Sequence, residues 1–233
     1  WFHAPHLPCV ASKEDVENYA VADPKLDGLH LNYYGCVTAL DRAVGKLRAR
    51  LRKLGVAKNT LVAFCSDNGP EGNQNAPGRQ GDFKGRKRSL YEGGVRVPSL
   101  LEWPARIKPG TSSEVATCTV DYFPTLLDLV GIEMPDDRPL DGISLVPLFE
   151  GKLESRPSPL GFHIRGQAAW HDGDWKAYCS KVNSHEWELY NLKDDPYEKK
   201  NRAADKLLKL EAMVGAWGKW KASVETSDKG GDY

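Results

Sequence analysis

The sequence predicts an α/β domain followed by a smaller α+β subdomain. An amphipathic helix over residues 29–54 leads into a short apolar strand over 61–65, which is the helix–strand unit of an α/β sheet. From Leu160 onward, short strands alternate with turns before one final helix, which indicates a small antiparallel sheet with a terminal helix. The Pro-rich stretch 151–159 separates the two patterns, so the predicted domains are residues 1–150 and 151–233.

The helix over 29–54 is indicated by apolar residues at steps of three and four, which form one stripe. They are Val37, Leu40, Val44, Leu47, Leu51 and Leu54. The opposite side is rich in Arg and Lys and is expected to face solvent. Gly55 is placed to end the helix.

The strand over 61–65 ends in the turn Ser66-Asp67-Asn68-Gly69. Ligands of α/β sheets bind beyond the carboxyl ends of strands, and the oxygens of Asp67 and Asn68 suit Ca²⁺ or Mg²⁺. The same residue types also form ordinary polar turns, so the turn alone does not decide between the two interpretations.

For the middle of the chain, the sequence predicts a long polar loop, a strand and a second helix. The loop over 69–88 has no periodicity, which favours a functional or mobile segment. Residues 91–103 are strand-like and interrupted by Pro98. A helix is expected over 119–130, with Asp121 near its start and Gly131 as its stop.

In the subdomain, strands are expected over 160–164, around Trp170, and over 175–181 and 186–192, with a turn at Asp172-Gly173-Asp174. The last helix is expected over about 203–222, and residues 226–233 are expected to fray. The side chains predicted to face inward from this helix are Leu207, Leu210, Met213, Val214, Trp217 and Trp220.

Composition excludes several classes of protein. Lys and Arg (32) balance Asp and Glu (32), which gives no support for a nucleic-acid-binding or polybasic membrane surface. No apolar stretch approaches the ~20 residues that span a bilayer. The five cysteines show no CxxC or zinc spacing, so free thiols are expected.

The chain opens at Trp1 without an initiator Met or a signal sequence. We therefore expect it to be the C-terminal part of a longer polypeptide. Half of a sheet exposes apolar surface, so association with the complementary N-terminal half, or with a second copy, is expected.

Three segments contain side chains suited to catalysis or metal binding: Pro5-His6-Leu7-Pro8, Ser66 to Glu71, and Lys87 to Pro98. Asp67 and Asn68 supply metal ligands, while His6 and Lys87 supply donors or positive charge for a tetrahedral oxyanion. This combination suits hydrolysis of a sulfate or phosphate ester at a metal.

These segments resemble the C-terminal half of type I sulfatases, the arylsulfatase family of the alkaline phosphatase superfamily. The resemblance runs almost the whole length and implies a mixed-sheet, alkaline-phosphatase-like catalytic domain. The matching stretches are the helix end Leu54-Gly55, the turn at 66–69, Tyr91 to Pro98, 103–107, 121–127, 140–145, 188–192 and 195–198.

The resemblance implies roles for four residues. Asp67 and Asn68 match the family's second pair of calcium ligands, Lys87 matches the lysine on the sulfate group, and His6 matches the histidine on the sulfate and the leaving-group oxygen. The alternatives are a solvated loop lysine for Lys87 and a packed histidine for His6. The family nucleophile, a formylglycine made from Cys in Cys-x-Pro-Ser-Arg, has no match here, and neither does the first metal-ligand pair of adjacent aspartates. Both are expected on a preceding part.

Further candidates are weaker. His3, His163, Arg165 and His185 could line a substrate cleft, and Asn73, Gln74 and Asn75 could contact a sugar. The expected substrate is a sulfated small molecule or carbohydrate, and the family implies a periplasmic, secreted or lysosomal protein. The alternatives are a phosphomonoester or phosphonate monoester hydrolase of the same superfamily, and an inert fragment or pseudoenzyme that binds a partner.

Overall fold

The computed structural model describes residues 2–73, 75–134 and 136–232. The chain divides into two compact units. The first comprises residues 1–81 and 96–105, and the second comprises residues 82–95 and 106–233. This division does not test the domain boundary predicted near residue 150, which stays a prediction.

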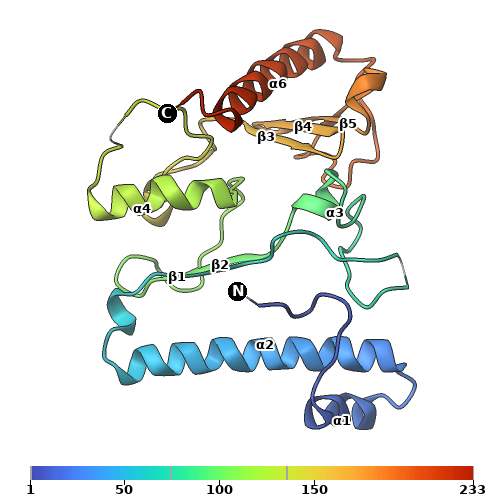
Figure 1. The fold of residues 1–233 in the computed structure, drawn as a ribbon, viewed down its shortest axis with the longest axis vertical. Helices are drawn as coiled ribbons and strands as arrows, with labels where there is room; N and C mark the ends of the chain where they lie inside the picture. Colours follow the sequence, from blue (N-terminus) through green and yellow to red (C-terminus); the bar gives the residue numbers. More distant parts are fainter. Residues whose placement is uncertain (1, 74, 135, 233) are drawn as a thin grey trace. The chain divides into compact units, whose positions relative to one another are not determined.

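The first unit contains two α-helices, a short 3-10 helix and a two-stranded sheet, which can be followed in Figure 1. Helix α1 (Lys13–Ala22) packs against α2 (Gly28–Lys53), and strand β1 (Val62–Cys65) pairs antiparallel with β2 (Ser99–Glu102). A short 3-10 helix, η1 (Ala57–Asn59), joins α2 to β1. The predicted helix over 29–54, its stop at Gly55 (φ 72°) and the predicted strand over 61–65 are confirmed.

Helix α1 was not predicted because its sequence carries no continuous apolar stripe. Local polar contacts define it instead: the Ser12 hydroxyl accepts from the Asp15 backbone N–H, as an N-cap does. Asp15 is buried and pairs with Arg42 of α2. Gly35 of α2 lies close to α1 and to the residue before its cap, since an added Cβ would lie 3.4 Å from the Asp15 Cβ and 2.6 Å from the Ala11 Cβ. Several contacts therefore hold the helix pair together, among them this ion pair, the close approach at Gly35 and a 2.7 Å hydrogen bond between the Tyr19 and Thr38 hydroxyls.

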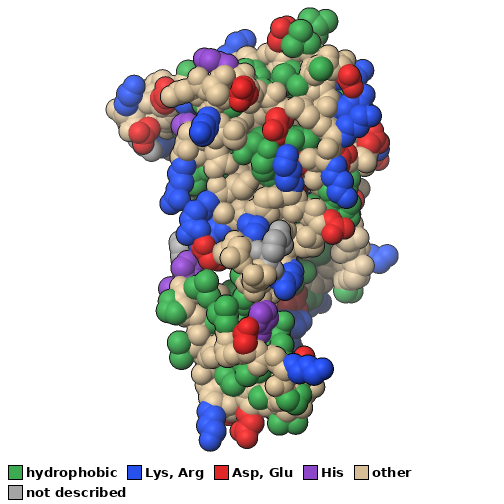
Figure 2. All heavy atoms as spheres, turned by 90° about the vertical axis from the view of Figure 1, so that its right-hand side faces the viewer, with side chains coloured by type: hydrophobic (Ala, Val, Ile, Leu, Met, Phe, Trp, Pro, Cys, Tyr) green, Lys and Arg blue, Asp and Glu red, His purple; other side chains and the backbone are tan. Residues whose placement is uncertain are grey.

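The predicted apolar stripe of α2 is only partly covered within this chain. Leu47 is 50% exposed and Leu54 is 55% exposed, whereas Gly35 and Cys36 are buried. Figure 2 likewise shows hydrophobic side chains at the surface over the α1–α2 region, in its lower part. This exposure agrees with the expectation of uncovered apolar surface.

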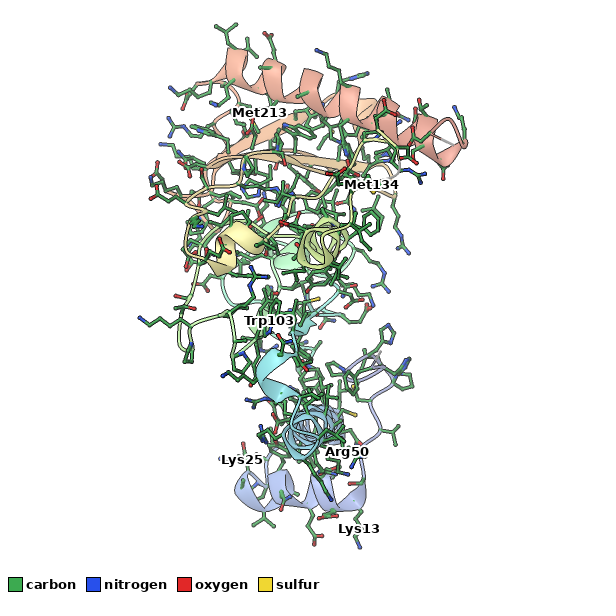
Figure 3. All side chains as sticks on the ribbon, turned by 90° about the vertical axis from the view of Figure 1, so that its left-hand side faces the viewer. Lys13, Lys25, Arg50, Trp103, Met134 and Met213 are labelled. Carbon is green, nitrogen blue, oxygen red and sulfur yellow. The ribbon has the colours of Figure 1, made fainter. Side chains whose placement is uncertain are left out.

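The second unit is built on a four-stranded antiparallel sheet in the order β3-β4-β5-β6. Its strands are β3 (Leu160–Ile164), β4 (Gln167–Asp172), β5 (Trp175–Cys179) and β6 (Trp187–Asn191), with a 3-10 helix, η3 (Val182–Ser184), before β6. Helix α6 (Leu207–Asp228) covers one face, and Met213 (labelled in Figure 3) lies in the core between helix and sheet. The predicted antiparallel sheet, terminal helix and turn at 172–174 are confirmed.

The terminal helix differs from its predicted bounds. It begins at Leu207 rather than near residue 203, because Asn201 and Arg202 hold the preceding segment to β6 through the backbone of Leu189. Leu207 is 57% exposed, so its predicted inward orientation is wrong. The helix continues to Asp228, so residues 226–228 are helical rather than frayed.

The remaining helices of the second unit are α3 (Glu92–Val95), α4 (Tyr122–Val130), preceded by the 3-10 helix η2 (Thr119–Asp121), and α5 (Val146–Phe149). The predicted helix over 119–130 and its stop at Gly131 (φ 67°) are confirmed. The strand-like interpretation of 91–103 holds for β2 but is wrong for 92–95. There the backbone N–H groups of Gly94 and Val95 both donate to the Tyr91 carbonyl and form a helical turn.

Asp121 organises the loops around α4. Its carboxylate is fully buried and accepts a bidentate pair from Arg156, at 2.8 and 2.9 Å. It also accepts from the backbone N–H groups of Cys118 (2.7 Å) and Ile143 (2.9 Å). One carboxylate therefore fixes three loop segments that lie far apart in sequence.

Among the described residues, no helix combines the length and apolarity needed to cross a bilayer.

Candidate functional site

The turn at the end of β1 has a defined geometry. The Ser66 hydroxyl donates to the Asn68 carbonyl at 3.0 Å, and the Asn68 side-chain nitrogen donates to the Gly69 carbonyl at 3.0 Å. The Ser66 backbone N–H donates to the Pro98 carbonyl at 3.2 Å and extends the pairing with β2. Because the amide nitrogen of Asn68 is engaged, its Oδ1 is the atom left to bind a ligand.

The Asp67 carboxylate is exposed, and in the described part of the chain it forms no hydrogen bond or ion pair. An uncompensated carboxylate beside an available amide oxygen is the donor chemistry that Ca²⁺ and Mg²⁺ prefer, so the turn fits a hard cation. Ca²⁺ takes six to eight oxygens, and residues 2–73, 75–134 and 136–232 contain no cluster of three or more potential His, Cys, Asp or Glu ligands. The turn therefore offers part of a coordination shell.

His6 lies in a turn near the N-terminus, with its backbone N–H donating to the His3 carbonyl at 2.9 Å. Its Nδ1 lies 2.6 Å from the Leu7 carbonyl oxygen. A carbonyl only accepts, so Nδ1 carries the proton and the exposed ring presents Nε2. The packed-histidine interpretation does not describe this exposed ring.

Lys87 occupies the second position of a four-residue turn, in which the Ser89 N–H donates to the Arg86 carbonyl at 3.0 Å. Arg88 at the third position has φ 74°, the left-handed region that a type II turn requires and that favours glycine. The Lys87 side chain is partly exposed.

Two glycines of α3 allow the Lys87 turn (residues 86–89) to pack directly against this helix. Gly93 donates to the Lys84 carbonyl at 2.7 Å, and an added Cβ there would lie 2.3 Å from the Gly85 carbonyl oxygen. A Cβ on Gly94 would lie 2.0 Å from the Ser89 carbonyl oxygen. No larger residue fits, so the Gly93-Gly94 pair lets the loop lie directly on the helix backbone.

Gly94→Ala is expected to destabilise the protein by about 3 kcal/mol, because the new methyl group meets backbone atoms that cannot rotate away. Gly218→Ala is the matched control. Gly218 is an exposed residue of α6 with open space around its Cα, so alanine there should be neutral or stabilising by about 0.5–1 kcal/mol. Urea unfolding of both variants measures the difference; equal stability of the two would contradict the close-approach argument.

A tyrosine cluster lies beside the turn. Tyr91 and Tyr190 both donate to one oxygen of Glu188, at 2.7 and 2.6 Å, and burial together with that carboxylate raises the pKa of both phenols. Lys84 donates to the Tyr190 hydroxyl at 3.0 Å and lies 4.0 Å from the centre of the Tyr91 ring. Lys84 therefore interacts with both tyrosines of this cluster.

A buried ion triad anchors α3 to the sheet. Lys176 of β5 pairs with Glu92 at 2.8 Å and with Glu198 at 3.0 Å, and all three side chains are buried. The Glu92 backbone N–H also donates to Glu198 at 2.6 Å. Burial raises the pKa of Glu198. The sequence did not predict this triad; a lysine between Trp175 and Ala177 in a buried strand was the available signal.

The predicted site residues fall in both units: His6, Asp67 and Asn68 in the first, Lys87 in the second. Among the described residues, no hydrogen bond or ring contact joins His6 to the Asp67–Asn68 turn. The weaker candidates His3, Asn73, Asn75, His163, Arg165 and His185 are all exposed, and Gln74 lies outside the described residues. Their roles stay predictions.

Comparison with known proteins identifies the family of the chain. The model of the sulfatase family matches residues 1–132, and that of the N-sulphoglucosamine sulphohydrolase C-terminal region matches residues 78–214. Mouse steryl-sulfatase (Mus musculus) is 40% identical over 176 residues, which cover 70% of this chain and 28% of the relative.

Solved structures extend the similarity to the fold. The crystal structure of Ps i-CgsB superimposes with a TM-score of 0.83 at 33% identity, covering 95% of this chain and 49% of that one. Its complex with k-i-k-neocarrahexaose gives 0.82 at the same identity, covering 94% and 48%. The present chain thus spans about half the length of these structures, and less of the steryl-sulfatase. The predicted fold class is confirmed, and because the sulfatase model matches more than half of its residues, the chain belongs to the sulfatase family.

Proposed function

We propose that this chain is the C-terminal half of an enzyme that hydrolyses a sulfate monoester, with a sulfated carbohydrate as substrate. The observation that carries the proposal is the turn after β1, where Asp67 is uncompensated and Asn68 presents an oxygen. The family membership supports the reaction class, and the turn would provide oxygen ligands for the metal ion that the proposed reaction requires.

Asp67 and Asn68 would hold a calcium ion together with ligands from a preceding part. When bound, the cation would neutralise charge on the sulfate oxygens. Lys87 would contact the same group, since an ammonium held on a fixed turn compensates developing negative charge without reorganising. His6 would act at the leaving-group oxygen, where its Nε2 can hold the proton that the departing alcohol takes up.

The nucleophile would be a formylglycine outside this chain. The motif Cys-x-Pro-Ser-Arg does not occur in the 233 residues of this chain. Carbohydrate is favoured over a sterol because the structure that matches 94% of this chain was solved with an oligosaccharide, whereas the steryl-sulfatase match covers 70%. An extracytoplasmic location is part of the same proposal.

The test is turnover by the intact protein that contains this chain, assayed with matched 4-nitrophenyl sulfate, phosphate and phenylphosphonate esters in the presence of calcium. We expect the sulfate ester to be the preferred substrate. The Lys87→Ala variant should lose about a hundredfold in kcat/KM for it. A preference for the phosphate or phosphonate ester would favour the rival hydrolase, and no turnover of any ester would favour a pseudoenzyme.

A further inference from the structure

We propose that Gln167, the first residue of β4, is a positioning residue for Lys87, and that the C-terminal sheet thereby takes part in sulfate recognition. The proposal rests on the proposed function, because it gives Lys87 its role on the sulfate group. The residues that carry it belong to one compact unit.

Gln167 binds the backbone at and after the Lys87 turn through both the nitrogen and the oxygen of its side-chain amide. Its Nε2 donates to the Arg88 carbonyl at 2.7 Å, and its Oε1 accepts from the Leu90 backbone N–H at 3.3 Å. The Tyr178 hydroxyl donates to the same Oε1 at 3.1 Å. A single amide thus binds the chain directly after Lys87 and is itself oriented by a tyrosine that is almost fully buried.

The turn depends on such external support. Arg88 has φ 74°, a conformation that is unfavourable for a non-glycine residue, so the segment does not adopt it by local preference. A glutamine amide suits the position because it both donates and accepts, and the turn offers one carbonyl and one N–H. The two hydrogen bonds offset the backbone strain.

Besides the hydrogen bonds of Gln167, the residues that follow the turn also pack against the same sheet. Leu90 is buried in a small cluster with Ala169 and Tyr178, which are cross-strand partners on one face of the sheet. The Tyr91 and Tyr178 rings lie 3.9 Å apart between centroids, and the next residue, Glu92, enters the buried triad with Lys176. The residues that follow Lys87 therefore contact the same sheet at several successive positions.

This arrangement has a functional consequence. A sulfate-binding lysine on a loose loop must be ordered each time substrate binds, whereas a lysine on a fixed turn is already in place. Gln167 would thus raise transition-state affinity without contacting the substrate. Sequence inspection did not single it out because it lies 80 positions after Lys87 and belongs to no catalytic pattern.

The first measurement is limited trypsin digestion of the intact protein under native conditions, with cleavage sites read by mass spectrometry. Gln167→Met keeps the length of the side chain and removes its hydrogen bonds, and it should raise cleavage after Lys87 and Arg88 about tenfold. Gln167→Glu keeps the acceptor and should raise it less. Asn183→Ala, an exposed residue of η3, is the matched control and should leave cleavage unchanged.

The second measurement is a double-mutant cycle on sulfate ester hydrolysis. Gln167→Met should lower kcat/KM about tenfold in the wild-type background and have no further effect in Lys87→Ala. An equal loss in both backgrounds, or unchanged cleavage at the turn, would overturn the proposal. If the wild-type protein hydrolyses no sulfate ester, the proposed function fails together with the role of Lys87, whereas the digestion still decides whether Gln167 holds the turn.

Discussion

Asp67→Ala in the intact protein is expected to lower turnover of a sulfate ester by at least about a hundredfold. The carboxylate is the strongest potential ligand of the turn after β1, and even residues that only support metal ligands cost about 10–100-fold when changed. Turnover of 4-nitrophenyl sulfate should be measured across a calcium titration. Because Asn68 would remain, added calcium should restore part of the activity.

Asp41→Ala provides the control for this prediction. Asp41 is an exposed aspartate of α2 in the same unit, and its removal changes the net charge equally. It should leave both turnover and calcium dependence unchanged. Full activity of Asp67→Ala, or an equal loss in the two variants, would remove the metal site from the proposal.

Asp121→Ala is expected to lower the free energy of unfolding by about 3–5 kcal/mol, since it leaves the Arg156 guanidinium buried without a counter-charge. The backbone N–H groups of Cys118 and Ile143 also lose their carboxylate acceptor, which adds to this cost. Urea unfolding followed by tryptophan fluorescence measures the change.

Two further variants define this effect. Asp121→Asn keeps the shape and one acceptor, so its loss should be smaller than that of alanine. Asp172→Ala, at the exposed end of β4, should change stability by less than about 0.5 kcal/mol. If Asp121→Ala unfolds at the same urea concentration as Asp172→Ala, the buried pair contributes little to stability.

The elements that the sequence predicted correctly are those with strong local patterns. The α2 stripe, the short β1 run and the glycine stops at Gly55 and Gly131 depend on residues close in sequence. The errors arose where distant contacts decide the local structure. Leu207 fits the apolar period of α6 but lies beyond its covered part. Residues 92–95 form a helical turn in which Glu92 is held by Lys176 of β5 and by Glu198, which lies after β6.

The candidate site divides in the same way. Asp67, Asn68, His6 and Lys87 are recognisable because each lies in a short motif. The residues that hold Lys87 in place are not, because Gln167 and Lys176 lie 80 or more positions away and meet the turn only through the fold. Long-range polar contacts of this kind leave no periodicity in a single sequence.

The turn after β1 also bears on the chemical durability of the protein. Asn68 is followed by Gly69, and an Asn-Gly pair is the sequence in which the following backbone nitrogen most readily attacks the side-chain amide, expels ammonia and closes a succinimide ring. Hydrolysis of that ring leaves aspartate or isoaspartate in place of the proposed metal ligand. Here the Ser66 hydroxyl and the Gly69 carbonyl tie down both the backbone and the amide of Asn68, and a residue so held cannot easily rotate into the cyclising geometry. The same two hydrogen bonds that orient a ligand oxygen therefore oppose this reaction, and stored protein that loosens there would exchange the amide oxygen for a carboxylate without unfolding.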